Sequence, residues 1–213
     1  ATITYTSNQL INLIGLLGGL NFSIPLYLRT VPGQTVAAGT YTVTLNLAVT
    51  YRVCTGLSLP GICLSLSDQN GSGTIPITVT MVVTNDCTTI TAADISFGSA
   101  PLVNSFSTVS QSISVICTKG STYTVGVDNG THAAGGVRRM ASGGNFLSYD
   151  IYKDSTTNRW GSVGAERRSS TTSSSVSGDG LTRTYNYTAK GLTTQNTPPA
   201  GNYTDSVIVD LSF

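Results

Sequence analysis

The sequence predicts an all-β protein organised as two modules. Thr, Ser, Gly, Val, Tyr and Asn dominate its 213 residues, and these are the residues of strands and tight turns. Long segments such as residues 40–53 and 74–83 alternate between apolar and other side chains, which is the period-2 pattern of a strand with one buried face. A short motif, Ala-Gly-x-Tyr, occurs twice, at residues 38–41 and 200–203. Because the two copies stand in similar strand contexts, we expect two copies of one domain type.

Composition excludes several classes of partner. Charged residues make up 10% of the chain and the formal net charge is +1, so we expect no binding to nucleic acid or anionic lipid. The sequence contains no stretch of about 18 apolar residues, which is the length that a membrane-spanning helix needs. Residues 1–5 lack the basic and apolar regions of a signal peptide, and we expect that such a signal was removed or precedes the sequence.

The first module begins with two short strands and an apolar loop. Residues 2–6 and 20–30 read as strands, the second with Pro25 at an edge or bulge. Three glycines weaken a helix over residues 10–20, and we expect a glycine-bent hairpin or loop there. A second apolar loop lies at residues 54–63. Both loops could pack in a core or be exposed, and exposed apolar patches mark interaction sites. The candidate surface-binding residues are Leu13, Ile14, Leu16, Leu17, Leu20, Leu57, Leu59 and Ile62.

The strand before Cys87 stands at the junction of the modules. Residues 68–73 predict a turn or short linker, and a strictly alternating strand follows. Its apolar residues are Ile75, Ile77, Val79, Met81 and Val83. The order of the repeat assigns this strand to the first module.

The second module contains a series of shorter strands. Asn129-Gly130 predicts a tight turn, and residues 169–180 predict a polar loop rich in Ser and Thr. The predicted strands lie at residues 90–97, 106–117, 123–128, 147–152, 181–190 and 203–213.

The four cysteines predict disulfides. Three pairings of Cys54, Cys63, Cys87 and Cys117 can be drawn, and the module boundaries favour Cys54–Cys63 and Cys87–Cys117. Structural disulfides imply an oxidising compartment such as the periplasm or the cell exterior. With a single histidine, His132, and no Cys-x-x-Cys, the sequence predicts neither a metal site nor a cofactor.

The two modules differ in length before their Ala-Gly-x-Tyr motifs. The second has a long run of strands from Cys87, whereas 37 residues precede Ala38 in the first. Either the first domain is naturally short or its leading half is missing from this chain, and we favour the second explanation because so few strands cannot close a sandwich. The predicted domains are therefore residues 1–85 and 86–213.

The second module resembles the spore coat protein U-like domain of bacterial secreted pilins. The resemblance rests on the order of several short segments over residues 87–213: Cys87, Ile95-Ser-Phe-Gly98, Ser114-Val-Ile-Cys117-Thr118, Tyr123-Thr-Val125, Arg139-Met140, Leu147-Ser-Tyr-Asp-Ile-Tyr152, Trp160-Gly161 and Ala200-Gly-Asn-Tyr203.

This resemblance implies a subunit of an archaic chaperone–usher pilus with an incomplete immunoglobulin-like sandwich that lacks its last strand. A periplasmic chaperone fills the open groove first, and a donor strand of the subdistal pilin replaces it after passage to the outer-membrane usher. The groove edge would be formed by Val207, Val209, Leu211 and Phe213, whereas the strand before Cys87 would complete the first domain within the chain. Two domains imply a tip adhesin, secreted through the periplasm to the pilus tip at the cell surface.

The leading functional hypothesis is therefore a tip adhesin that attaches bacteria to abiotic or host surfaces and supports biofilm formation. The alternative is a structural pilin or spore-coat-like subunit without a receptor of its own. A secreted hydrolase or lectin would rest on Trp160 and on scattered acids such as Asp128, Asp150, Asp154, Glu166 and Asp179. Because His132 lies in a glycine-rich loop, no catalytic triad is predicted and the protein is expected not to be an enzyme.

Overall fold

The computed structural model describes residues 26–213 except residues 55–57, 60–61 and 64–67, and it describes the side chains outside residues 52–69. These residues form strands, turns and three short 3-10 helices, so the protein is all-β. No helix among them has the length and apolarity to cross a bilayer. The chain divides into two compact units, the first reaching to Pro32 and resuming over Tyr41–Met81, the second made of Gly33–Thr40 and Val82–Phe213.

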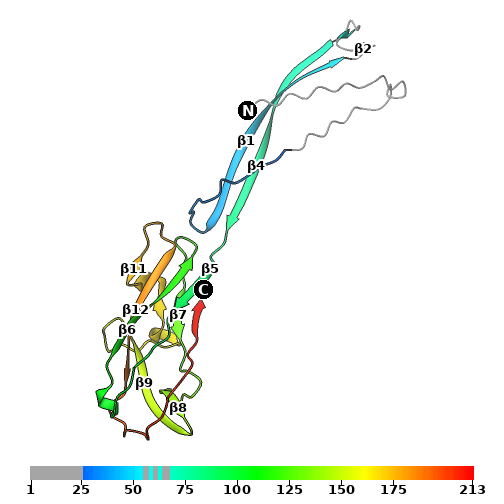
Figure 1. Ribbon diagram of the computed structural model, residues 1–213. Coiled ribbons are helices and arrows are strands. Elements are labelled where there is room, and N and C mark those ends of the chain that lie inside the picture. The colour runs from blue at the N-terminus through cyan, green and yellow to red at the C-terminus, as the bar shows by residue number, and fades with distance from the viewer. Residues whose placement is uncertain (1–25, 55–57, 60–61, 64–67) are drawn as a thin grey trace. The chain divides into compact units, whose positions relative to one another are not determined.

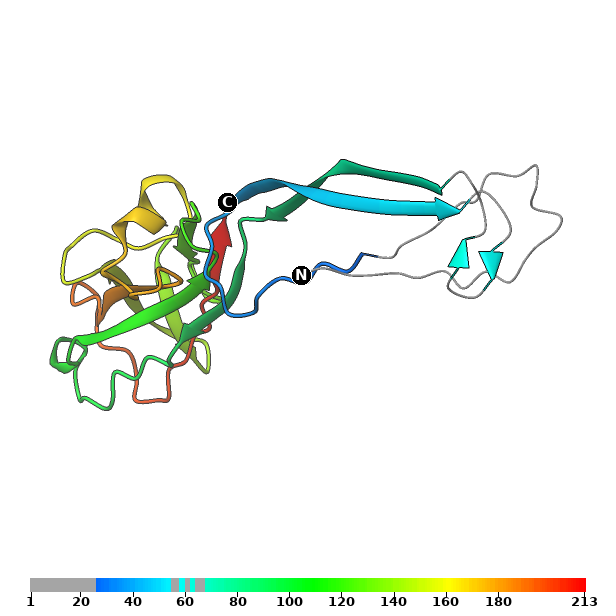
Figure 2. The ribbon, with the colours of Figure 1, turned by 90° about the horizontal axis from the view of Figure 1, so that it is seen from above.

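The first unit contains a two-stranded ribbon of β1, Gly39–Cys54, and β4, Asp68–Val83 (Figures 1 and 2). Between them, β2, Ser58–Leu59, pairs with β3, Ile62–Cys63. The alternating patterns over residues 40–53 and 74–83 thus lie in β1 and β4. The prediction of a turn or short linker at residues 68–73 is wrong, because these residues belong to β4. Residues 26–30 form no strand, unlike the expectation for residues 20–30, and they lead into a turn where Gly33 has a φ of 80°.

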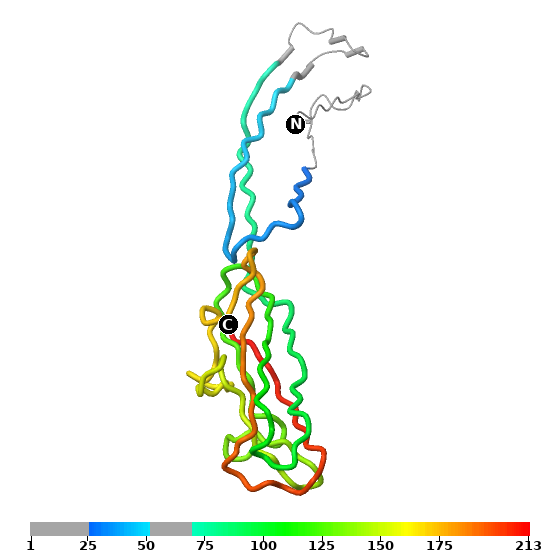
Figure 3. The backbone as a smooth tube through the Cα atoms, turned by 60° about the vertical axis from the view of Figure 1, so that its left-hand side comes forward, coloured from blue at the N-terminus to red at the C-terminus, as the bar shows by residue number. Residues whose placement is uncertain are grey.

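The second unit is built from two antiparallel sheets. The larger has the order β5-β6-β12-β9-β8, with β11 on β12, and the smaller has the order β10-β7-β13. The strands of this unit are β5 Cys87–Ala92, β6 Val109–Cys117, β7 Thr124–Val127, β8 Arg138–Ser142, β9 Asn145–Lys153, β10 Arg168–Ser169, β11 Ser175–Val176, β12 Thr182–Gly191 and β13 Val209–Ser212. The 3-10 helices are η2 Val103–Ser105, η3 Gly164–Glu166 and η4 Ser170–Thr172. The path of the chain through this unit, ending with β13, can be followed in Figure 3.

Strand β6 is an inner strand of the larger sheet. It pairs with β12 over eight residues, from Thr182 opposite Ile116 to Ala189 opposite Val109, and with β5 on its other side. Cys87 at the start of β5 lies opposite Cys117 at the end of β6, and the two form a disulfide with an S–S distance of 2.00 Å. This confirms the predicted Cys87–Cys117 pairing.

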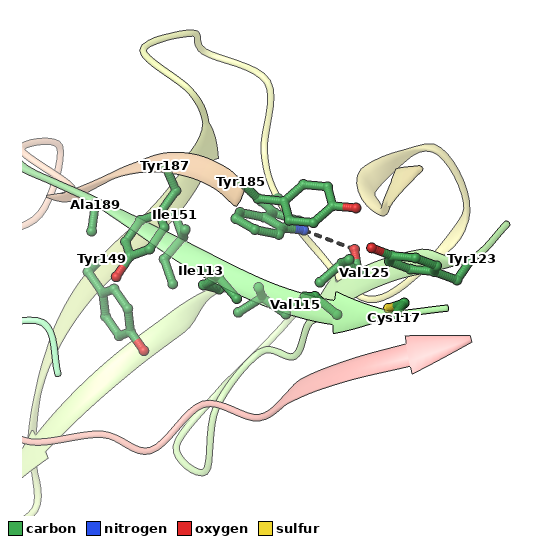
Figure 4. Packing of buried hydrophobic residues seen from close by; sticks show 12 residues of the cluster. Ile113, Val115, Cys117, Tyr123, Val125, Tyr149, Ile151, Tyr185, Tyr187 and Ala189 are labelled. Atoms are coloured by element: carbon green, nitrogen blue, oxygen red, sulfur yellow. Dashed lines mark hydrogen bonds between the residues drawn. The ribbon is translucent and has the colours of Figure 1, made fainter. Parts of the chain in front are cut away.

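The core of the second unit lies between the two sheets and is rich in aromatic side chains (Figure 4). Trp160 and Tyr185 are fully buried, and their ring centroids are 6.1 Å apart. The indole nitrogen of Trp160 donates to the Val125 carbonyl at 3.0 Å, so its one polar atom is paired inside the core. The buried core residues are Ile113, Val115, Cys117, Tyr123, Val125, Val127, Tyr149, Ile151, Trp160, Tyr185, Tyr187 and Ala189.

Candidate functional site

The β1–β4 ribbon carries one continuous apolar face. Side chains of alternate residues share a face, and a Cβ added to Gly71 would meet the ring of Tyr51, so the odd-numbered residues of both strands face the same side. Seven apolar side chains of this face are between 37% and 55% exposed: Tyr41, Val43, Leu45, Leu47, Tyr51, Ile75 and Met81. The even-numbered residues of β1 include Thr42, Thr44, Asn46 and Thr50. The ribbon therefore has the two-faced pattern of a sandwich strand pair.

The second unit has an apolar edge where its two sheets end. β5 is the last strand of the larger sheet and β13 the last of the smaller one. Among the described residues, partly buried side chains near both strands pack against the core: Cys87, Ile95, Phe97, Met140, Val207, Val209 and Leu211. Two other apolar residues at these edges are more open, Ile90 at 39% and Phe213 at 64% exposed. We call this region, between β5 with its following loop and β13 with its leading segment, the edge groove.

A hollow of about 500 Å³ lies at one end of the edge groove. The loop after β5 contributes Ile95 and Phe97 to it, and the segment before β13 contributes Tyr203. Met140 of β8 and Leu147 of β9 also line it. Its lining is mixed, with apolar side chains from both walls of the groove beside several Ser and Thr residues, so it can hold apolar side chains of a ligand.

A buried arginine ties the two sheets together behind this groove. Arg138 is fully buried, and its guanidinium donates to the Asp150 carboxylate at 2.5 Å. It also donates to the carbonyls of Asp128, Val127 and Trp160, each at 2.7 Å. Burial lowers the pKa of Arg138, and the charge of Asp150 acts against that effect. Arg138 therefore supplies donors to three carbonyls and shares the Asp150 carboxylate with Arg159.

Arg159 extends this ion pair toward the surface. It donates to Asp150 at 2.9 Å, to Glu166 at 2.7 Å and to the Asn129 side chain at 2.6 Å. Burial opposes its charge, but Asp150 and Glu166 outweigh it and raise the pKa of Arg159. The acids Asp150 and Glu166, scattered in the sequence, are thus partners of arginines and not a catalytic pair.

A second arginine packs on aromatic rings. The guanidinium of Arg168 lies 5.4 Å from the ring centroid of Trp160 and 5.2 Å from that of Tyr185. It also donates to the carbonyl of Asn186 at 2.7 Å and pairs with Asp154 at 3.1 Å. The stacking on two rings and the hydrogen bonds of the guanidinium thus hold Arg168 in place against the core.

His132 is bound within a structural cluster. Its Nδ1 lies 3.2 Å from Oδ1 of Asp205, whose Oδ2 accepts from the hydroxyl of Tyr149 at 2.8 Å. Burial, and then the hydrogen bond to Asp205, raise the pKa of Tyr149. Over the described part of the chain, no three His, Cys, Asp or Glu side chains gather in a way that could hold a metal ion. The hydrogen bonds of Asp205 join the 130–132 loop and strand β9 to the segment before β13.

The structure describes only some of the residues predicted for surface binding. Leu13, Ile14, Leu16, Leu17, Leu20 and Leu57 lie outside the described residues. The backbones of Leu59 and Ile62 pair in the β2–β3 hairpin, but their side chains lie outside the described part, as do those of Cys54 and Cys63. For these positions the predictions from the sequence stand untested.

The described predicted residues fall into two groups. Ile75, Ile77, Val79 and Met81 lie in β4 within the first unit, and Val83 ends β4 within the second. Val209 and Leu211 lie in β13 and, with Val207, pack against the core, whereas Phe213 is 64% exposed beside the ring of Tyr123. Sequence analysis missed the clusters around Arg138 and Asp205. The pair Arg138-Arg139 within an alternating strand was the only sequence feature that could have indicated a buried arginine. No sequence feature marked Asp205.

Comparison with known proteins agrees with this architecture. The Spore Coat Protein U domain matches residues 73–210. No curated protein matches the chain. Among solved structures, a chain of the CsuC–CsuE chaperone–tip adhesion subunit pre-assembly complex, from archaic chaperone-usher Csu pili of Acinetobacter baumannii, is 29% identical with a TM-score of 0.60. The match covers 94% of this chain and 68% of that chain.

The likeness to the tip adhesin CsuE thus extends over both units, and the domain match covers more than half of the sequence. Pilus subunits of this kind are structural proteins and not enzymes. The chain belongs to the Spore Coat Protein U domain family.

Proposed function

We propose that this protein is a tip adhesin subunit of an archaic chaperone–usher pilus. The observation that carries the proposal is the match to CsuE over 94% of this chain, since it includes the ribbon unit as well as the pilin-like unit. Residues 1–85 would be the C-terminal part of an adhesin domain, and residues 86–213 an immunoglobulin-like pilin domain without its last strand. The protein would pass through the periplasm and reach the cell surface at the pilus tip.

The edge groove supports the pilin part of this proposal. An exposed strand edge next to an incompletely covered core attracts an added strand, because that strand supplies both backbone partners and apolar side chains. The groove presents this combination between β5 and β13. In this proposal a periplasmic chaperone fills it before assembly at the usher, and a donor strand of the subdistal pilin fills it afterwards. The relative was crystallised in a complex with the chaperone CsuC.

The apolar face of the ribbon supports the adhesin part. A two-stranded ribbon is marginally stable alone, so its exposed odd-numbered face needs a second layer. We infer that this face is the inner face of the adhesin-domain sandwich, with Ile75, Ile77, Val79, Met81 and Val83 in its last strand. The surface contacts would then come from the loops that carry Leu13, Ile14, Leu16, Leu17, Leu20, Leu57, Leu59 and Ile62.

Surface attachment would depend on desolvation. Full burial of a leucine side chain contributes about 1.5–3 kcal/mol, before the cost of ordering the loop. Leu16→Asp with Leu17→Asp should therefore reduce adhesion of piliated cells to an apolar plastic by at least about tenfold, with unchanged pilus number. Thr171→Asp with Ser175→Asp, at exposed polar residues of η4 and β11 in the pilin domain, is the matched control and should leave adhesion unchanged. Equal adhesion of both variants would show that Leu16 and Leu17 are not part of the contact surface.

Position in the fibre separates the adhesin from a structural pilin or coat subunit. Immunogold labelling of the intact protein should mark the ends of pili. Labelling along the whole shaft would assign the chain to the structural alternative.

A further inference from the structure

Asp205 holds the segment before β13 in place. Its side chain is 2% exposed, and its two oxygens have different partners. Oδ1 accepts from the amides of Thr131 and His132 at 3.0 and 3.4 Å, whereas Oδ2 accepts from the Tyr149 hydroxyl at 2.8 Å. One carboxylate thus joins the segment to a loop on one side and to the centre of strand β9 on the other.

The 130–132 loop is shaped to receive this carboxylate. Gly130 has a φ of 78°, and a Cβ added there would collide with the Asp205 carboxyl group. The amide of Gly130 is bound by Asp128 at 3.0 Å, and Asp128 also accepts from the amide of Ile208 at 2.8 Å. The loop and the segment before β13 therefore fit together closely around Asp205.

Tyr149 connects this segment to the opposite wall of the edge groove. Its ring packs edge-on against Phe97, with centroids 6.1 Å apart and an interplanar angle of 64°. Phe97 lies in the loop after β5 and lines the hollow, as does Tyr203 from the other wall. Figure 4 shows Tyr149 at the end of the core cluster, with its hydroxyl directed toward the chain that leads into β13. One side chain thus touches one wall with its ring and the other with its hydroxyl.

From this geometry we infer that Asp205 and Tyr149 are positioning residues that set the separation of the two groove walls for an incoming strand. The inference rests on the proposed strand-accepting function. Walls that are fixed in advance do not have to be ordered during binding, so the strand associates faster and more tightly. Without the Tyr149–Asp205 hydrogen bond, the segment before β13 would keep its backbone contacts but lose its connection to Phe97.

The occupant that this geometry fits is an extended apolar strand. The probe is a labelled peptide with the sequence of residues 74–84 of this chain, in which apolar residues alternate with Thr or Pro as far as Met81, and Val82 and Val83 follow. Association with the full chain is followed by fluorescence anisotropy after mixing. Tyr149→Phe should slow association by about tenfold, which corresponds to the loss of one hydrogen bond of about 1.4 kcal/mol.

Tyr187→Phe is the matched control. Tyr187 is also buried and also donates one hydrogen bond to a side chain, that of Gln111 on β6 at 2.8 Å. It should shift the urea midpoint about as much as Tyr149→Phe while leaving the association rate unchanged. Asp205→Asn should retain most of the association rate, because the new amide group can accept from the loop and donate to the Tyr149 oxygen. Asp205→Ala should slow association at least as much as Tyr149→Phe.

Hydrogen exchange of the free protein provides a readout without the peptide. In Tyr149→Phe, amides of residues 95–97 and 203–207 should exchange faster than in Tyr187→Phe. A wild-type association rate for Tyr149→Phe, or faster exchange confined to residues 130–132, would overturn the positioning role. Failure of the wild-type chain to bind the peptide would instead count against the strand-accepting function, and with it against this role in binding.

Discussion

Arg138 provides the sharpest test of how the second unit is held together. In Arg138→Met the methionine fills much of the volume but leaves the carbonyls of Asp128, Val127 and Trp160 without their donor. Removing one partner of a buried ion pair costs about 3–5 kcal/mol, and we expect the lower end because Asp150 keeps Arg159. Three unsatisfied carbonyls add about 1 kcal/mol each. The expected loss is about 6 kcal/mol, comparable to the whole stability of many domains.

Arg139→Met is the control at the neighbouring position. Arg139 donates one hydrogen bond, to the His132 carbonyl at 2.9 Å, and its guanidinium lies 4.1 Å from the ring centroid of Phe146. Because this contact is partly exposed, we expect a loss of about 1 kcal/mol. Arg138→Lys should lower the free energy of unfolding by an amount between those of Arg138→Met and Arg139→Met, since an ammonium group has three donors for four acceptors.

Urea unfolding followed by tryptophan fluorescence measures these changes. The chain has a single tryptophan, and Trp160 is fully buried in the second unit, so the signal reports on that unit within the full chain. The reasoning would be refuted if Arg138→Met and Arg139→Met lowered the free energy of unfolding by amounts within 1 kcal/mol of each other.

Three further predictions concern the disulfide, alkaline pH and the ribbon. Replacing Cys87 and Cys117 by Ser should lower the free energy of unfolding by about 3–4 kcal/mol, the loop-closure entropy for a separation of 30 residues, as measured by urea unfolding with and without reductant. Burial raises the pKa of four tyrosines, Tyr149, Tyr152, Tyr185 and Tyr187. A raised folded pKa favours the neutral form, so stability should be constant below about pH 10 and then fall by up to about 1.4 kcal/mol per pH unit and tyrosine, with tyrosinate absorbance rising together with unfolding. In the ribbon, Gly71→Val should displace the ring of Tyr51 and speed hydrogen exchange in β4, whereas Gly73→Val, where a Cβ meets nothing within 4 Å, should not.

Local patterns in the sequence were sufficient for most strands. Period-2 alternation placed β1 and most of β4, whose odd-numbered side chains share one apolar face, and the strands predicted at residues 106–117 and 181–190 contain β6 and β12. The prediction failed at residues 68–73, where Asn70-Gly71 gives a turn signal. Tyr51 covers this glycine from the partner strand, and a cross-strand contact of this kind is not visible in the local sequence. Tertiary packing here overrides turn propensity.

The candidate site was predicted in outline but not in its polar detail. Alternation identified the inward residues of β13, yet regular pairing begins only at Val209, because the preceding segment crosses between the sheets with Asp205 as its anchor. Asp150 and Glu166 read as stray acids, since their arginine partners, Arg138 on β8 and Arg159 after β9, meet them only once these segments pair with β9. Ion pairs of this kind follow from the fold, and a single sequence carries no pattern for them.

The Cys87–Cys117 disulfide also determines how the second unit would bear tension. Cys87 begins β5, which has one hydrogen-bonded neighbour, whereas Cys117 ends β6, which has two. A pull on the chain ahead of Cys87 would otherwise peel β5 from its sheet one hydrogen bond at a time. The disulfide passes the load covalently to β6, an inner strand, and the amide of Thr118 beside it donates to the Asp86 carbonyl at 2.8 Å. The 30-residue separation, about 100 Å of extended chain, is thereby kept out of the load path.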